Sequence, residues 1–159
     1  MQTLSLGVSM LTASRLAYGC WRIAGNPPSA SPEAHAEGKR AVAAAFEAGY
    51  TLFDNANIYG RGEAEKILGS ALREISGLRE RAIIATKCGV RHAGDPDPGS
   101  PHRWDFSGDH LVRSCEESLN RLGLEAIDLF MLHRPDYLGD PAEIAEAFTR
   151  LQNAGKARW

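Results

Sequence analysis

Four residues with chemically useful side chains stand at or near the ends of apolar runs. Asp54 follows the run 50–53, and Tyr59 lies five residues later in the segment FDNANIYG. Lys87 follows an apolar run that begins at Ala82, and His133 follows Phe130-Met131-Leu132. An acid, a phenol, an ammonium group and an imidazole brought together could assist a reaction in which an oxygen atom gains negative charge.

Each of the four residues also has an ordinary structural explanation. An aspartate at a strand end most often caps a turn, a tyrosine in a loop packs its ring on the surface, and a lone histidine is more often structural than catalytic. Lys87 is harder to explain, because burying an ammonium group without a partner is costly. Asp54 is the partner that we expect for Lys87. The combination at three successive strand ends favours catalysis.

The chemistry of such a group follows from the ionisation of a tyrosine. An unperturbed phenol, with a pKa near about 10, is a poor acid at neutral pH. A neighbouring ammonium group favours the phenolate, and a carboxylate keeps that ammonium group charged and oriented. A neutral histidine can donate a hydrogen bond to a carbonyl oxygen and polarise it. Reduction of a carbonyl group by hydride is one reaction that needs this set, and it requires a nicotinamide cofactor.

The elements that must position these residues alternate along the chain. Apolar runs alternate four times with segments of helical spacing, and caps such as Ser31 and Gly123 bound the helices. We expect strands near 16–20, 50–53, 82–86 and 127–132, and helices near 31–48, 63–75, 111–122 and 140–154. A weak alternation over 3–11 indicates a short hairpin. The segment 89–108 is expected to be a long loop, either a flexible surface loop or, through Trp104 and Phe106, a wall of the substrate pocket.

This alternation predicts an α/β fold with a parallel sheet, whose carboxyl ends lie on one rim. Asp54, Tyr59, Lys87 and His133 should therefore converge. A doubly wound sheet and a TIM-type barrel both fit the pattern. Four units do not close a (β/α)8 barrel, which typically needs about 250 residues, and the chain has 159. The fold is either small and open or the first half of something larger.

Composition excludes several function classes. The chain is 43% hydrophobic with a formal net charge of -2, so nothing in it attracts nucleic acid or an anionic membrane. The N-terminal segment predicts neither a signal peptide nor a membrane span. Three cysteines, widely spaced, indicate reduced thiols in a cytoplasm. The histidines at 92, 102 and 110 have no metal-ligand spacing with them, and we expect no metal.

The motifs that surround these residues resemble the aldo-keto reductase family. The resemblance rests on Gly19-Cys20-Trp21 after the first strand, on FDNANIYG, on ATKCG around Lys87 and on DLFMLHRPD around His133. It covers about Leu16 to Trp159, and GCWRI, TKCG and LHRPD resemble a bacterial branch of NADPH-dependent oxidoreductases.

The resemblance implies a (β/α)8 barrel, NADPH as the hydride donor and aldehydes or ketones as substrates. It implies that Tyr59 donates the proton, that Lys87 and Asp54 adjust the acidity of the Tyr59 hydroxyl group, and that His133 orients the carbonyl. Residues Gly19, Cys20 and Trp21, together with Asp54, would border the cofactor, although Trp21 is equally explained as a packing residue at the barrel mouth.

The same resemblance implies that residues 1–159 are a single domain truncated on its C-terminal side, since family members continue through four further strands. We expect weak NADPH binding, and weak or absent turnover, from this chain alone.

Two alternative functions stay open. The chain could be a non-catalytic half-barrel that self-associates, or pairs with another chain, through its open strand edge. A hydrolase or metal enzyme of TIM type fits the architecture but lacks a ligand cluster or paired carboxylates. A dinucleotide-binding fingerprint at Gly60-Arg61-Gly62 is rejected, because Glu65 stands where a third glycine is needed.

Arg134 either shapes its loop or meets a substrate anion, and Cys88 is expected to pack rather than react.

Overall fold

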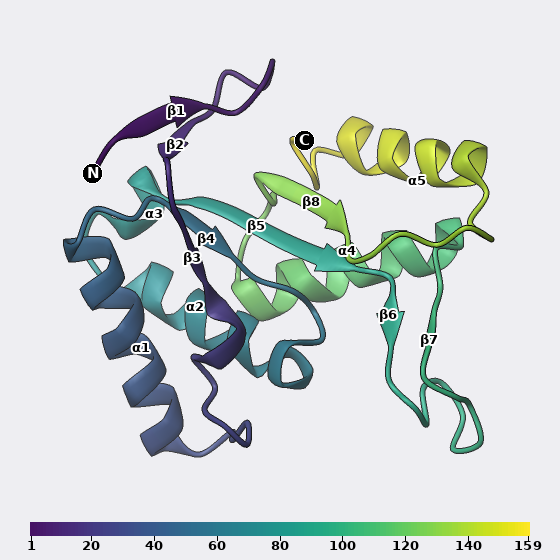
Figure 1. Ribbon diagram of the computed structural model, residues 1–159, viewed down its shortest axis with the longest axis horizontal. Helices are drawn as coiled ribbons and strands as arrows, with labels where there is room; N and C mark the ends of the chain where they lie inside the picture. The colour runs from purple at the N-terminus through teal and green to yellow at the C-terminus, as the bar shows by residue number, and fades with distance from the viewer.

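A four-stranded parallel sheet forms the centre of the molecule, which we describe from a computed structural model of all residues 1–159 (Figure 1). Its strands are β3 (Ala17–Gly19), β4 (Leu52–Asp54), β5 (Ile83–Cys88) and β8 (Leu129–Leu132), in that spatial order. Each strand pairs in parallel with the next along the chain. The strand order thus follows the sequence without the reversal that a doubly wound sheet requires.

The helices cover one face of this sheet. They are α1 (Pro32–Glu47), α2 (Glu63–Glu74), the short α3 (Leu78–Arg81), α4 (Gly108–Leu122) and α5 (Pro141–Asn153). α2 packs between α1 and α4, and α4 packs against α5. No helix is both long and apolar enough to cross a membrane.

The hydrophobic core lies between the sheet and these helices. Phe53 pairs with Ile84 on the neighbouring strand, and Phe130 pairs with Thr86, two residues further along β5. Phe53, Ile84 and Phe130 belong to the core cluster together with the apolar faces of the helices. Their sequence neighbours Leu52 and Leu129 point to the other face and are only partly buried. One covered and one open face are expected for part of a barrel wall, and four successive βα units are present.

Helix ends follow the predicted signals. The Ser31 Oγ atom accepts a hydrogen bond from the Ala34 amide at 3.2 Å, and Asp140 accepts one from the Ala142 amide at 2.8 Å. α4 ends at Gly123, whose φ of 67° is the left-handed conformation that glycine adopts without strain.

A short antiparallel hairpin precedes the sheet. It consists of β1 (Thr3–Ser5) and β2 (Thr12–Ser14), so a hairpin is present but its second strand begins just beyond the predicted range 3–11. The Ser14 hydroxyl oxygen accepts a hydrogen bond from the Thr51 amide at 2.9 Å, which attaches the hairpin at the amino end of β4. The hairpin therefore lies at the opposite end of the sheet from Asp54.

The segment 89–108 is not the plain loop expected from the sequence. β6 (Val90–Arg91) and β7 (Arg103–Trp104) pair as a second antiparallel hairpin that extends beyond the carboxyl end of β5 (Figure 1). Arg91 forms ion pairs with Asp105 at 2.6 Å and Asp95 at 3.1 Å. Two-residue strands are too short to show periodicity, which is why sequence analysis missed them.

A buried carboxylate links three elements. Glu65 of α2 is fully buried and accepts hydrogen bonds at 2.6 Å from Thr86 of β5 and from Arg121 of α4. Both carboxylate oxygens are thereby satisfied, which compensates for the loss of water. The glutamate that excludes a dinucleotide fingerprint is thus a structural residue.

Candidate active site

The four residues singled out in the sequence lie at the carboxyl end of the sheet. Asp54 is the last residue of β4, and Lys87 is the last but one of β5. His133 directly follows β8, and Tyr59 begins the 3₁₀ helix η2 (Tyr59–Gly62) in the connection to α2. Contacts between their side chains show that the parallel strands do bring them together.

Lys87 occupies the centre of the group. Its Nζ atom lies 2.7 Å from Asp54 Oδ1, donates to the Asn55 carbonyl oxygen at 2.7 Å and donates to the Tyr59 hydroxyl at 3.3 Å. An ammonium group has three N–H donors, so each one has a partner here. The ammonium group is thereby held in place and aimed at the tyrosine oxygen.

The chain between Asp54 and Tyr59 is fixed by hydrogen bonds that continue the pairing of β4 with β5. The Asn55 amide donates to the Ala85 carbonyl at 2.8 Å, and the Asn57 amide donates to the Lys87 carbonyl at 3.0 Å. These bonds set the path of the loop that ends at Tyr59. The contribution of the Asn55 carbonyl was missed in the sequence, because every residue has a carbonyl and no side-chain type reveals its use.

Tyr59 and His133 face each other. Their rings meet edge to face with centroids 5.5 Å apart. Burial lowers the pKa of His133 below its usual value, and the neighbouring positive charges of Lys87 and Arg134 lower it further. The imidazole is therefore neutral at physiological pH and can donate one hydrogen bond.

A cavity of about 580 Å³ opens beside this pair. Its walls come from the connection after β3, from η2, from the β6–β7 hairpin and from the loop after β8. Nine residues line it: Trp21, Ile58, Tyr59, Val90, His92, His102, Trp104, His133 and Arg134. Its volume lies within the range of about 300–1,000 Å³ that is usual for small-molecule sites.

The hairpin contributes to this cavity, although not through both of the residues considered from the sequence. Trp104 lines the cavity, whereas Phe106 is buried in the core. Val90, His92 and His102 were not identified as pocket residues, because the register of so short a hairpin cannot be derived from periodicity.

Gly19, Cys20 and Trp21, at the end of β3 and just after it, lie in different surroundings. The Trp21 side chain is 60% exposed and lines the cavity beside Tyr59. Cys20 is 0% exposed and belongs to the hydrophobic core, so its thiol does not border the cavity. Burial raises the pKa of this thiol, and it likewise raises that of Cys88, which keeps both thiols neutral.

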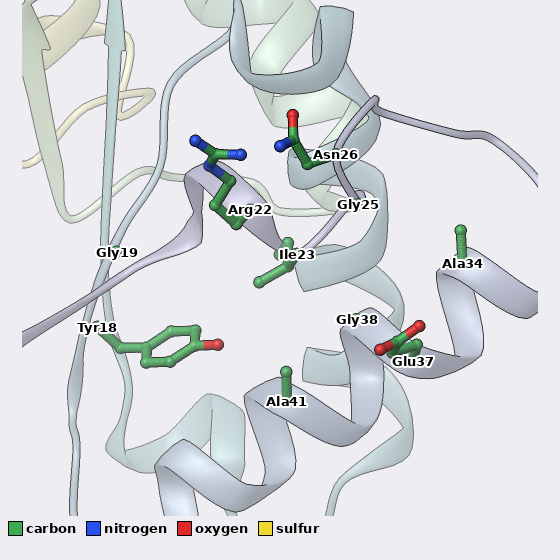
Figure 2. Close-up of a pocket in the computed structure, with 10 residues that line it drawn as sticks. All are labelled: Tyr18, Gly19, Arg22, Ile23, Gly25, Asn26, Ala34, Glu37, Gly38 and Ala41. Carbon is green, nitrogen blue, oxygen red and sulfur yellow. The ribbon is translucent and has the colours of Figure 1, made fainter.

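Gly19 lies at a different hollow, which Figure 2 shows between β3, the 3₁₀ helix η1 (Cys20–Arg22) and α1. This second cavity has a volume of about 320 Å³ and includes Tyr18, Arg22 and Glu37 in its lining. None of its lining residues belongs to the group around Lys87. The first cavity is therefore the one adjacent to the candidate chemistry.

Comparison with known proteins agrees with this geometry. A family model described as the aldo/keto reductase family matches residues 15–159. The chain belongs to the aldo/keto reductase family. The doubly wound, hydrolase and metal-enzyme alternatives are thereby set aside, and the sheet is the wall of a partial TIM-type barrel.

Bacterial relatives of this aldo/keto reductase family member include proteins named 6-dehydroglucose reductase. The one from Agrobacterium fabrum is 39% identical over 159 residues, covering 99% of this chain and 52% of the relative. The one from Novosphingobium aromaticivorans is 38% identical, covering 96% of this chain and 48% of the relative. The chain thus spans about half the length of the curated relatives it matches.

A solved structure gives the same correspondence in three dimensions. The holo form of aldo-keto reductase AKR11C1 from Bacillus halodurans superposes with a TM-score of 0.84 at 30% sequence identity. The match covers 100% of this chain and 49% of that one. The partial barrel therefore has the architecture of half a family member.

Proposed function

We propose that this site reduces aldehydes or ketones to alcohols by hydride transfer from NADPH, with Tyr59 as the proton donor. The observation that carries the proposal is the set of contacts around Lys87. The Lys87 ammonium group donates to the Tyr59 oxygen at 3.3 Å while the carboxylate of Asp54 holds the same ammonium group from the other side. Because the tyrosine oxygen already accepts one hydrogen bond, its own proton is free to point at a substrate.

The residues beside Tyr59 fit a cofactor and a small substrate. The cavity is bordered by Trp21 and Trp104 and reaches His133, so flat rings have aromatic surface to contact and a carbonyl has a hydrogen-bond donor. NADPH, when bound, supplies the hydride. NAD(P)H is general in this family, and our preference for NADPH over NADH rests on the family resemblance.

The chain's own residues perform the remaining steps. His133 donates a hydrogen bond to the carbonyl oxygen and orients it. As the carbonyl carbon accepts the hydride, the oxygen gains charge and takes the proton from the Tyr59 hydroxyl. The Lys87 ammonium group stabilises the tyrosinate that is left, Asp54 keeps that ammonium group in place, and solvent restores the proton.

We propose that these 159 residues act as one domain that holds the whole catalytic group but only part of the surface that surrounds a cofactor. The outer edge of β3 has no strand partner, and the side chains of Lys87 and Asp54 remain 15% and 33% exposed. Water therefore has access to the reacting groups, which weakens their electrostatic effect. We expect weak NADPH binding and slow turnover from this chain alone.

The substrate and the compartment belong to the same proposal. Relatives named 6-dehydroglucose reductase favour a small polar carbonyl compound. All three cysteines are free and buried, and we propose a cytoplasmic location, where free thiols are maintained.

The test is Tyr59→Phe, compared with Tyr50→Phe as the matched control. Tyr50 packs edge to face on Tyr18 with centroids 5.9 Å apart, outside the cavity. We expect Tyr59→Phe to lower carbonyl-dependent NADPH oxidation by about 10²-fold or more, with the circular dichroism spectrum unchanged. Equal loss in both variants, or none in Tyr59→Phe, would contradict the assigned role.

A second candidate function, self-association through the open half-barrel, is favoured by the free sheet edge. Residues 156–159 already run alongside β8, with the Phe130 amide donating to the Trp159 carbonyl at 2.8 Å, while β3 leaves its outer edge unpaired. Unpaired edges are templates for another strand. Sedimentation velocity over a hundredfold range of concentration tests this candidate: a growing dimer fraction supports it, and a constant monomer contradicts it.

A further inference from the structure

We propose that Arg134 recognises an anionic group on the substrate, so that the site prefers carbonyl compounds that carry a carboxylate or a similar acid group. This inference rests on the proposed carbonyl reduction and specifies its substrate class. Arg134 follows His133 directly and lines the same cavity.

The charge of the cavity wall supports an anionic ligand. None of the nine lining residues is an aspartate or a glutamate, and Arg134 is the only lysine or arginine among them. The nearest acid of the catalytic group, Asp54, is already paired with Lys87 at 2.7 Å. In a protein with a formal net charge of -2, this cavity is locally positive.

The Arg134 guanidinium group has no partner within the protein. It forms no ion pair and no hydrogen bond, and the residue is exposed. The acid closest to it in sequence, Asp136, instead accepts a hydrogen bond from the Leu138 amide at 3.0 Å. The five N–H donors of Arg134 are therefore available, and a guanidinium group can bind a carboxylate through two parallel hydrogen bonds.

The backbone at Arg134 gives an independent reason to assign it a function. Its φ is 136°, in the region that favours glycine, and Pro135 follows it. A residue before proline normally adopts an extended conformation with negative φ. Unfavourable backbone conformations of this kind cluster at ligand sites.

The phosphate groups of NADPH are a second possible source of the same chemistry. We assign Arg134 to the substrate because it adjoins His133, the residue proposed to hold the substrate carbonyl, and because it shares its cavity with Tyr59. An arginine that bound the cofactor would affect NADPH affinity instead, so the experiment must measure the binding of both the aldehydes and NADPH.

The experiment compares two ligands of similar shape, 4-carboxybenzaldehyde and 4-methylbenzaldehyde, titrated at pH 8 into the 159-residue protein. At this pH the carboxylate is ionised and the arginine is the charged group on the cavity wall. Binding is followed through the indole N–H signals of Trp21 and Trp104 in ¹H–¹⁵N NMR spectra. We expect the carboxylate ligand to bind about tenfold more tightly, and the difference to shrink as salt is added.

Two arginine variants and one control complete the design. Arg134→Gln should abolish the preference, and Arg134→Gly should abolish it while preserving or raising the stability of the fold, because glycine suits the backbone there. Arg113→Gln removes the same charge from an exposed position on α4 outside this cavity and should keep the preference.

The outcomes separate this inference from the proposed activity. The ligand preference needs no hydride transfer, so a Tyr59→Phe protein should retain it, and failure of the reduction assay would leave it measurable. Equal binding of the two aldehydes, or binding of neither, would overturn the inference. A loss of NADPH affinity in Arg134→Gln with the aldehyde preference intact would overturn it too, by assigning the arginine to the cofactor.

Discussion

Lys87 is the residue whose three hydrogen-bond donors define the site. It contacts the Asp54 carboxylate, the Asn55 carbonyl and the Tyr59 hydroxyl, so one side chain both positions the proposed proton donor and places an ammonium group next to it. A neutral side chain of similar length would leave the tyrosinate without a counter-charge.

Lys87→Met should therefore lower kcat for carbonyl reduction by about 10²-fold or more, with a smaller effect on KM. Lys39→Met is the matched control, because Lys39 makes an exposed surface pair with Glu74 far from the cavity. Steady-state kinetics measure both. Similar kcat values for the two variants would show that Lys87 does not act on the proton donor.

For single residues, the sequence predicted which side chains form the candidate site, but it did not predict all of their contacts. Asp54, Lys87 and His133 could be found because apolar runs mark where strands end. The Asn55 carbonyl could not be found, because a backbone group has no distinguishing letter. Cys20 adjoins Trp21 in the sequence, yet the two side chains point to opposite environments, since the 3₁₀ turn after β3 directs the thiol into the core.

Among the elements, the contact of α2 with α4 and β5 includes one buried carboxylate. Glu65 is 0% exposed, and its two carboxylate oxygens accept hydrogen bonds from Thr86 and Arg121. The connection from η2 to α2 carries Tyr59 at its beginning, so this buried contact also supports the loop of the proposed proton donor.

Glu65→Gln should destabilise the fold by about 3 kcal/mol, because it leaves Arg121 without its buried counter-charge. Glu74→Gln, which removes the exposed partner of Lys39, should change the free energy of unfolding by less than about 1 kcal/mol. Urea unfolding followed by circular dichroism measures both values. A loss below about 1 kcal/mol in Glu65→Gln would contradict the importance of the buried pair.

The main elements were predictable because helical spacing, caps and apolar runs agree with one another. α1 begins after Ser31 and α4 ends at Gly123 because an oxygen cap and a left-handed glycine satisfy free backbone groups there. The β6–β7 hairpin escaped prediction because ion pairs of Arg91 with Asp95 and Asp105, rather than an apolar pattern, hold it.

For the whole molecule, three half-buried or buried histidines predict how stability depends on pH. The pKa values of His92, His110 and His133 are all lowered, chiefly by burial. The unfolded chain therefore binds protons at a higher pH than the folded protein does, and stability is complete above about pH 6.5 and falls as the pH drops below it.

His110→Gln should flatten this dependence between pH 7 and pH 5. His110 is packed near the charged groups Asp105, Arg91, Arg113 and Asp95, which partly cancel, so burial decides the direction. His102→Gln, at an exposed position, serves as the control. The free energy of unfolding is measured in urea at each pH. An unchanged slope in His110→Gln would contradict the prediction.

A second loss of stability should follow at lower pH through Asp105. Burial alone would raise the pKa of Asp105, but hydrogen bonds from Ser107 and the ion pair with Arg91 outweigh it and lower the pKa to about 2. The stability that this carboxylate contributes is present above its unfolded pKa and is lost as the pH falls toward about 2. The loss of folding stability caused by protonation of Asp105 thus occurs at lower pH than the loss caused by protonation of the histidines.

The central claim is that Tyr59 and its neighbours support hydride transfer to a carbonyl, and isotope transfer tests it most directly. The protein is incubated for hours with 4-carboxybenzaldehyde and NADPH that carries deuterium at the transferable position of the nicotinamide, and the alcohol is analysed by mass spectrometry. We predict one deuterium on the carbinol carbon, accumulating in proportion to protein and strongly reduced in Tyr59→Phe. Alcohol without deuterium, no alcohol at all, or equal labelling with Tyr59→Phe would contradict the account.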